Sequence, residues 1–539
     1  MSLLTLSTEL LQLMASSLKQ QELLNLSLTC KRLRLATEPE LFREYSNVSQ
    51  FRRSFLPFLK RIIHRPELRR HTRKLSLRSW TALNTLQDRG LESNETRNET
   101  RNKRHEHISA QGAKLTAADY ILLVQAARDV EVIQEDAELD CSTCNSQIVN
   151  ETRCGTATVL PNPNGVHLCN RTFCDQLHAG SEDPLVVLLV ALLPNVREIT
   201  LDGVPGDMYA VSWQPKHGFP ELRTLVACAV DGELQWPLDF FQPLLASSRL
   251  RVLKASHATS RPPQLTRHQP MIQELSQLAL VSRTLVLERI ELENCCLRVS
   301  DLQSLLQCCS GLRSFLYTTR RCGLRPWSPS PADFVELLRP HETTLHTLIL
   351  DVDVHYYEDK VDQRRALIQS LSHMTALKVL VTAPEMWHCV AVGDVMVMDS
   401  NVRWEEWCLS MRVPPNVETL VFGLSEAEMT ASPSQLSDLI LMRTSMLSCL
   451  KTLSIGGIDP VYVEVVKQIH LDLQPLINTG QQELQVHVGC IYVRSIFDTR
   501  ECPNNRSEVI WVDRMYVAVP SEASFFERAY ERIRSDIFR

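Results

Sequence analysis

Cysteine and histidine side chains gather in one short segment of this chain. The segment contains a Cys-x-x-Cys pair, Cys141 and Cys144, followed by Cys154, His167, Cys169 and Cys174. Zinc needs about four thiolate or imidazole ligands in a tetrahedron, and a Cys-x-x-Cys turn supplies two of them. The expected ligand set is Cys141, Cys144, Cys154 and Cys169. The later spacings match neither a second Cys-x-x-Cys pair nor a cross-braced pair of zinc sites, so a metal-free surface loop is the favoured interpretation and zinc the alternative. No other cofactor is expected.

Catalytic motifs are absent from the sequence. It has no Gly-x-Ser-x-Gly elbow, no His-Glu-x-x-His pair and no Walker loop, and its 16 histidines are scattered singly. Lone histidines such as His346 and His373 are typical of surface or satisfied core positions rather than of catalytic bases. We therefore expect a protein that is not an enzyme.

Composition and charge describe an ordinary globular chain of 539 residues, with 44% hydrophobic residues, 22% charged residues and a net charge of -6. This charge is too small to favour nucleic acid or a membrane as a partner. The most apolar run, residues 185–193, is too short for a membrane span. The N-terminal leucines lack the preceding basic residues of a signal peptide. A cytoplasmic or nuclear protein with reduced cysteines is expected. The basic run at 52–78 favours a solvated helix face or linker, with nuclear targeting or an acidic partner as the alternative.

A short apolar motif of the form Leu-x-x-Leu-x-Leu, which we call the leucine phrase, recurs along most of the chain. Each phrase alternates in the manner of a short strand with one buried face, and a helical pattern usually follows it. The nine occurrences begin at Val196, Leu222, Leu250, Leu287, Leu312, Leu345, Leu377, Val417 and Leu450. Two earlier segments, 72–77 and 130–133, are candidates for the first strands of the same kind.

The helical patterns between the phrases carry recognisable start signals. Ser330-Pro331 precedes Phe334, Leu337 and Leu338, and the pairs Asp183-Pro184 and Ser432-Pro433 are similar. A strand, loop and helix unit cannot enclose its own apolar face, so the units must stack. The pattern predicts an α/β fold in which an irregular leucine-rich-repeat solenoid has parallel strands inside its curve and helices outside. The alternative, a doubly wound α/β domain, is disfavoured because no Gly-rich phosphate loop follows any strand.

The first 45 residues hold two leucine-rich helical patterns, at 6–18 and 23–35. Each has more than one apolar side, and two such short helices cannot cover all of these sides alone. The segments Leu6 to Leu11, Leu18, Leu23 to Leu28 and Thr29 to Leu33 resemble the F-box motif. Ser7 stands where the family usually has proline, and serine can cap the same helical turn. The repeats behind it resemble the degenerate leucine-rich arrays of fungal F-box proteins.

This resemblance implies a substrate-recognition subunit of an SCF-type, cullin-based ubiquitin ligase. The F-box would dock the small adaptor of the ligase, and the repeats would bind a target protein. The residues expected at the adaptor are Leu6, Glu9, Leu10, Leu13, Leu18, Leu23, Leu26, Leu28, Cys30 and Leu33, some of them as internal packing. Target contacts are expected at the outward strand positions Asp202, Glu291, Glu293, Asp351 and Asp353, which suits a basic peptide, although solvated strand ends explain the same residues.

Two other interpretations remain open. In one, the protein is a free-standing leucine-rich-repeat scaffold whose N-terminal helices cap the array. In the other, it is a zinc-dependent protein centred on residues 141–174. The expected organisation is a helical F-box module at 1–46, a basic linker with the first repeat at 47–90 and a disordered insertion at 91–112. An irregular repeat with a Cys-rich loop follows at 113–182, then the repeat array at 183–484 and a C-terminal cap at 485–539.

Overall fold

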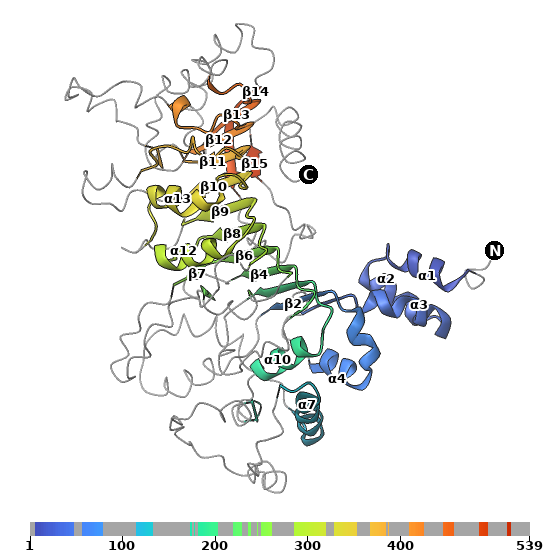
Figure 1. Cartoon of the computed structure of the whole chain (residues 1–539). Helices are drawn as coiled ribbons and strands as arrows, with labels where there is room; N and C mark the ends of the chain where they lie inside the picture. Colours follow the sequence, from blue (N-terminus) through green and yellow to red (C-terminus); the bar gives the residue numbers. More distant parts are fainter. Residues whose placement is uncertain are drawn as a thin grey trace, which may run out of the picture. The chain divides into compact units, whose positions relative to one another are not determined.

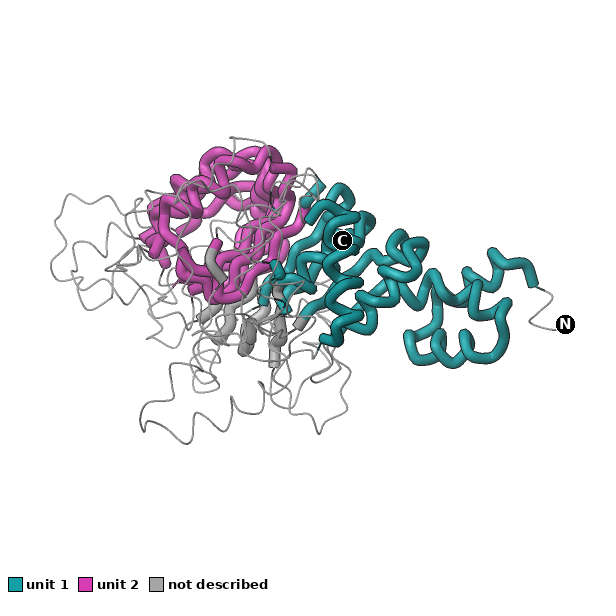
Figure 2. The backbone as a smooth tube through the Cα atoms, turned by 90° about the horizontal axis from the view of Figure 1, so that it is seen from below, with its two compact units in different colours: residues 1–236, 240–250 teal, residues 237–239, 251–539 magenta. Residues whose placement is uncertain are grey.

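The protein is a mixed α/β structure with a large, mainly parallel sheet and helices at its N-terminal end, seen here in a computed structural model (Figure 1). The chain divides into two compact units: unit 1 is residues 1–236 and 240–250, and unit 2 is residues 237–239 and 251–539 (Figure 2). The structure describes residues 6–47, 56–78, 115–132, 173–174, 177, 182–202, 219–228, 236–238, 245, 249–260, 285–319, 328–352, 367–383, 386–387, 409–424, 446–457, 485–493 and 515–518.

Unit 1 begins with three helices and continues into parallel strands. Its elements are α1 (Thr8–Ala15), α2 (Gln20–Ser27), α3 (Lys31–Leu41), β1 (Glu44–Ser46), α4 (Leu56–His64), the 3-10 helix η2 (Pro66–His71), β2 (Lys74–Arg78), α7 (Ala117–Asp129), α10 (Asp183–Ala191), β3 (Glu198–Asp202) and β4 (Thr224–Cys228). The strands pair in parallel in the order β1, β2, β3 and β4.

Unit 2 carries the longer run of strands. Its elements include β6 (Val252–Ser256), β8 (Arg289–Glu293), α12 (Val299–Cys308), β9 (Ser314–Thr318), α13 (Pro331–Leu338), η6 (Arg339–His341), β10 (Thr347–Asp351), β11 (Val379–Thr382), η10 (Leu409–Met411), β12 (Thr419–Leu424), β13 (Thr452–Gly457), β14 (Gln485–Val493) and β15 (Met515–Ala518). The strands from β6 to β14 pair in parallel, skipping the short β7 (Ala258–Thr259), and β15 is antiparallel to β14. A second short strand, β5, covers Trp236–Pro237. Figure 1 shows α12 and α13 on the same side of β8, β9 and β10.

The recurring leucine phrase forms a strand at all nine predicted places. Each strand begins two residues after the first apolar residue of its phrase, as β10 does at Thr347 after Leu345. The second residue of each of these strands is at most 1% exposed, because parallel strands in register stack equivalent positions into one buried column. In unit 1 this column includes Leu75, Ile199 and Leu225, and in unit 2 it includes Leu253, Ile290, Phe315, Leu348, Leu380, Leu420 and Leu453.

The two earlier candidate strands differ in outcome. Residues 72–77 supply β2, as predicted. Residues 130–132 do not form a strand, because Thr116 and Asp119 form a capping box that starts α7, and this helix continues to Asp129 with Val130 as its C-cap. Glu131 then turns the chain with a φ of 55°. The prediction of a strand at 130–133 is therefore wrong over its described residues.

The predicted helix starts are confirmed where the structure describes them. Ser330 accepts the backbone N–H of Asp333, and the Asp333 carboxylate accepts the backbone N–H of Ser330, so α13 has the expected cap. Pro184 lies in the first turn of α10, but the N-cap is Glu182 rather than Asp183, and it makes no side-chain cap hydrogen bond. Ser432-Pro433 and the insertion at 91–112 lie outside the described residues. Within the described ranges, every helix is too short or too polar to cross a membrane.

Candidate docking surface on the N-terminal helices

The N-cap of α1 is Ser7, the residue that stands where the motif it resembles usually has proline. Ser7 has an extended backbone, and its hydroxyl accepts the N–H of Leu10 at 3.4 Å. Glu9 lies in the same turn, where backbone and Ser7 hydrogen bonds hold the pKa of its carboxyl below the usual value. A negative charge in the first turn also suits the helix dipole. The expectation that serine caps this helix is confirmed.

The second predicted helical pattern is two helices rather than one. Leu28 is the C-cap of α2, and Cys30 is extended, with φ -158° and ψ 162°, before α3 begins at Lys31. The Thr29 hydroxyl donates to the carbonyl of Leu26 at 2.8 Å, which competes with continuation of the helix. This break changes which leucines of the segment share a face.

A small apolar core joins these helices. Leu11 of α1 packs with Leu33 and Ala36 of α3, and three partly buried side chains complete the cluster: Leu6, Leu26 and Cys30. Leu23 of α2 is 5% exposed. The guanidinium of Arg32 donates to the carbonyl of Leu6 at 2.6 Å and ties the chain before α1 to α3. The core is therefore narrow and uses only one side of each helix.

Six large apolar side chains of these helices remain open to water. Leu10, Leu13 and Met14 follow the i, i+3, i+4 spacing of one face of α1, and Leu24 and Leu28 lie four residues apart along α2. The exposed fractions are 49% for Leu10, 68% for Leu13, 45% for Met14, 41% for Leu24, 77% for Leu28 and 57% for Leu35. Scattered exposed leucines are normal on a protein, but six exposed large apolar side chains on three short helices are an unusual concentration. We call these six residues the leucine surface.

The ten residues predicted at the adaptor divide into three groups. Leu10, Leu13 and Leu28 belong to the leucine surface, and Glu9 is also exposed. Leu23 and Leu33 are core residues, and four are partly buried: Leu6, Leu18, Leu26 and Cys30. The sequence reasoning missed Met14, Leu24 and Leu35. Met14 and Leu24 could have been found by their spacing of four from Leu10 and Leu28, whereas Leu35 depends on where α3 begins.

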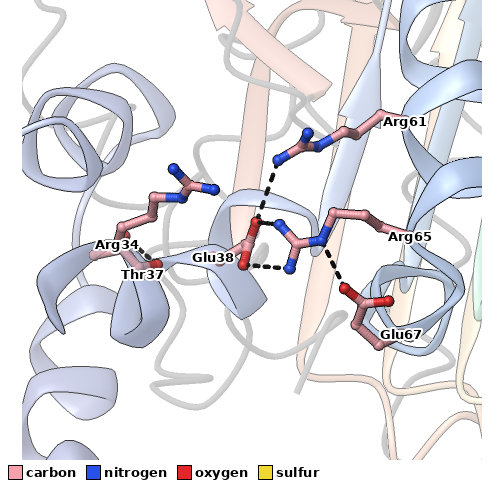
Figure 3. Close-up of polar contacts among 6 residues, drawn as sticks. All are labelled: Arg34, Thr37, Glu38, Arg61, Arg65 and Glu67. Atoms are coloured by element: carbon pink, nitrogen blue, oxygen red, sulfur yellow. Dashed lines mark hydrogen bonds and ion pairs between the residues drawn. The ribbon is translucent and has the colours of Figure 1, made fainter. Parts of the chain in front are cut away.

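A buried carboxylate fixes α3 to the helices that follow it. Glu38 is 7% exposed, and both of its oxygens accept hydrogen bonds from the guanidinium of Arg65, one of them from Nη2 at 2.9 Å (Figure 3). Arg61 lies 3.8 Å from the same carboxylate, and the Nε of Arg65 donates to Glu67 at 2.6 Å. These bonds raise the pKa of the Arg65 guanidinium above its usual value, so it stays charged. Bidentate arginine and carboxylate pairs have a fixed geometry and therefore orient the elements they join.

Aromatic packing reinforces this attachment. The ring of Phe58 in α4 stacks on Tyr45 of β1, with centroids 4.0 Å apart, and on Phe42 at the end of α3, with centroids 5.9 Å apart. Residues 56–78 of the basic run are thus folded as α4, η2 and β2. Several of its cations bind within unit 1, including Lys60 to Asp119 and Lys74 to Glu198 at 3.0 Å.

Four of the five predicted target-binding acids lie on described strands, and the two on β8 are buried. Glu291 and Glu293 of β8 are only 2% and 4% exposed, and Glu291 forms ion pairs with Arg289 and, at 2.9 Å, with Lys254. Asp351 is partly buried at the end of β10. Asp202 ends β3, and Asp353 lies outside the described residues. A basic peptide would reach Glu291 and Glu293 only after the structure rearranged.

The predicted zinc ligands Cys141, Cys144, Cys154 and Cys169 all lie outside the described residues. Among the residues that are described, no group of three or more His, Cys, Asp or Glu side chains is placed to hold a metal ion.

No model of a known protein family matches this chain. A search of curated proteins also finds no match to it.

Proposed function

We propose that this protein is the substrate-recognition subunit of an SCF-type, cullin-based ubiquitin ligase. In this proposal α1, α2 and α3 are an F-box that docks the small adaptor subunit, and the strand and helix repeats form a leucine-rich solenoid that binds a target protein. The observation that carries the proposal is the leucine surface, which the chain's own core leaves open to water.

The leucine surface favours a partner because leucine side chains that remain in water do not stabilise the isolated chain, whereas burying them against a partner would stabilise the complex. Fully burying a leucine side chain contributes about 1.5–3 kcal/mol, and Leu13 and Leu28 are among the most exposed large apolar residues described. A helical cap that only closes a repeat array would instead carry a polar outer face. The F-box resemblance of the same residues gives the partner its identity as the adaptor.

The repeated strands support the second half of the proposal. Parallel strands in register with one buried column, together with α12 and α13 on one side of the strands in unit 2, are the parts of which a leucine-rich solenoid is built. The contribution to ubiquitin transfer would be proximity, since holding a target beside the charged conjugating enzyme raises its effective concentration. In this proposal the protein acts in the cytoplasm, the nucleus or both.

Co-purification with the adaptor tests the proposal. The variant carries Leu13→Asp and Leu28→Asp, which place charge on the most exposed positions of α1 and at the end of α2. The matched control carries Gln12→Asp and Gln20→Asp, which add the same charge to exposed polar positions of the same helices. We expect the leucine variant to lose the adaptor and the glutamine variant to retain it. Retention by both would refute the proposed docking surface.

A second candidate, the free-standing scaffold, is favoured by one observation. The helices run directly into β1, which pairs with β2 at the edge of the strands of unit 1, and Glu38 and Arg65 join α3 to the element after α4. A cap would be attached in this way. The two candidates separate in the same experiment, because the scaffold predicts no adaptor in the wild-type preparation.

A further inference from the structure

Within each unit, one column of residues lies where the strands begin. We call each strand, with the loop and helix that follow it, a rung. We call the column the rung-entry column, and within each unit it consists of the residue directly before each of the strands β1 to β4, β6 and β8 to β13. Its members in unit 1 are Arg43, Arg73, Arg197 and Arg223, before β1, β2, β3 and β4. The backbone aligns them, because Arg73 donates its N–H to the carbonyl of Arg43 at 2.8 Å, Arg197 to Arg73 at 2.7 Å, and Arg223 to Arg197 at 2.8 Å. Neighbouring strands lie about 4.8 Å apart, so the column is a closely spaced row of arginines.

Three of the four column arginines of unit 1, at 73, 197 and 223, have no ion pair with a carboxylate among the described residues. Arg197 and Arg223 are exposed, and neither makes an ion pair with any residue that the structure describes. Arg43 binds Glu40 at 3.1 Å, and the guanidinium of Arg73 donates to the carbonyl of Asn195 at 3.2 Å. The acidic residues next to the column arginines in sequence either bind another cation or lie outside the column. Glu198 binds Lys74, and exposed Glu44 is the first residue of β1.

The rung-entry column of unit 2 contains acidic residues that pair with its cations. Its members are Arg251, Glu288, Arg313, His346, Lys378, Glu418 and Lys451. Glu288 forms an ion pair with Arg251 on the neighbouring rung, and Glu418 accepts from Lys378 at 3.1 Å and from Lys451 at 2.6 Å. These two lysines hold the pKa of Glu418 below its usual value. Unit 2 thus shows which group this column accepts beside its cations: a carboxylate from an adjacent rung.

We infer that the rung-entry column of unit 1 is a docking surface for a protein segment rich in aspartate and glutamate. Carboxylates of the partner take beside Arg197 and Arg223 the place that Glu288 and Glu418 take in unit 2. Arginine suits this role because its planar guanidinium binds a carboxylate with two hydrogen bonds. The sign of charge is the reverse of the basic target expected from Glu291 and Glu293, which are buried. That the segment belongs to a ubiquitination target rests on the proposed function, whereas its binding to the column does not.

Fluorescence anisotropy on the full chain tests the inference, with a labelled oligoglutamate peptide as the probe and an oligoglutamine peptide of equal length as its neutral control. The variant carries Arg197→Gln and Arg223→Gln. The matched control, Arg34→Gln with Arg128→Gln, removes the same charge from exposed positions of α3 and α7 in unit 1. We expect oligoglutamate to bind the column variant about tenfold more weakly than the wild type, which is about 1.4 kcal/mol. The control variant should bind like the wild type, and added salt should weaken the wild-type complex.

Three results would overturn the inference. The first is equal affinity of the column variant and the wild type, and the second is an equal loss in both double variants, which would indicate general attraction by net charge. The third is binding of a phosphoserine peptide without binding of oligoglutamate, which would make the partner a phosphorylated segment. A further pair, Arg197→Lys with Arg223→Lys, keeps the charge but loses the paired hydrogen bonds of the guanidinium, so it should bind oligoglutamate more weakly than the wild type and more tightly than the glutamine variant.

The adaptor pull-down separates this inference from the proposed function. The column variant should still co-purify with the adaptor, because its substitutions lie outside α1, α2 and α3. If the wild type bound oligoglutamate through the column but never bound the adaptor, the docking surface would stand and the ligase assignment would fail.

Discussion

Truncating two leucines of the leucine surface should weaken the proposed adaptor binding without weakening the fold. The perturbation is Leu13→Ala with Leu28→Ala. The two side chains are 68% and 77% exposed, and full burial of a leucine contributes about 1.5–3 kcal/mol, so covering their exposed parts contributes about 1–2 kcal/mol each. Together they should account for about 2–4 kcal/mol, or roughly a 30- to 1,000-fold change in Kd.

The stability of the helices should not fall in this variant. Alanine has the highest helix propensity, Leu13 lies inside α1, and Leu28 has αR dihedral angles at the end of α2. The contrast is Leu23→Ala, because Leu23 is 5% exposed, and truncation of such a core leucine costs about 2–5 kcal/mol. That variant should lose helical structure as well as binding.

Isothermal titration calorimetry with the purified adaptor measures the Kd, and hydrogen exchange over residues 6–47 reports whether the helices remain folded. Burial of apolar surface also gives binding a negative heat-capacity change, which should be smaller in the double alanine variant. A folded double variant whose Kd lies within a factor of about 2 of the wild type would refute the reasoning, since a change that small is only about 0.4 kcal/mol.

Three further substitutions test the contacts that support the two units. Glu38→Gln removes the carboxylate held by Arg65, and a loss of about 1–2 kcal/mol should appear as faster hydrogen exchange in α3 and α4; unchanged exchange would contradict the orienting role. Lys60 holds the pKa of the Asp119 carboxyl below its usual value, so this ionised group stabilises the fold above its usual pKa and loses that effect as pH falls through the lowered pKa. In urea unfolding, Asp119→Asn should therefore be less stable than the wild type at neutral pH, and the difference should shrink in acid; a constant difference would exclude this linkage. Ser330→Ala should cost about 1 kcal/mol by removing the cap of α13, measured as a lower urea midpoint, and an unshifted midpoint would show that the cap contributes nothing.

Much of the strand arrangement could be read from the sequence because it depends on local pattern. An alternating apolar phrase specifies a strand with one buried face, and equivalent phrases stack in register, so all nine strands and their buried column were predictable. Start signals such as Ser330-Pro331 were equally clear. The strand expected at 130–133 failed because a short apolar run does not distinguish a strand from the end of a helix, and the capping box at Thr116 decided for the helix.

The candidate site was only partly predictable, because exposure is a property of packing. The pattern of residues 6–35 showed more apolar sides than two helices can bury, but it could not say that Leu23 and Leu33 face the core while Leu24 and Leu35 face water. The break at Leu28 to Cys30 sets the rotation of α3 relative to α2, and a rotation of one residue turns a side chain by about 100°. Sequence spacing alone does not contain that rotation.

By itself, the sequence determined the parallel strands, their order along the chain and the surplus of leucine at its start, because these follow from apolar spacing and turn chemistry. Only the tertiary structure decided which charges are available. Glu291 is buried between cations, Glu38 is bound by Arg65, and the arginines at 43, 73, 197 and 223, far apart in the sequence, form one row. The physical reason is that burial and charge pairing arise between residues that the chain separates widely, and only the fold brings them within reach of one another.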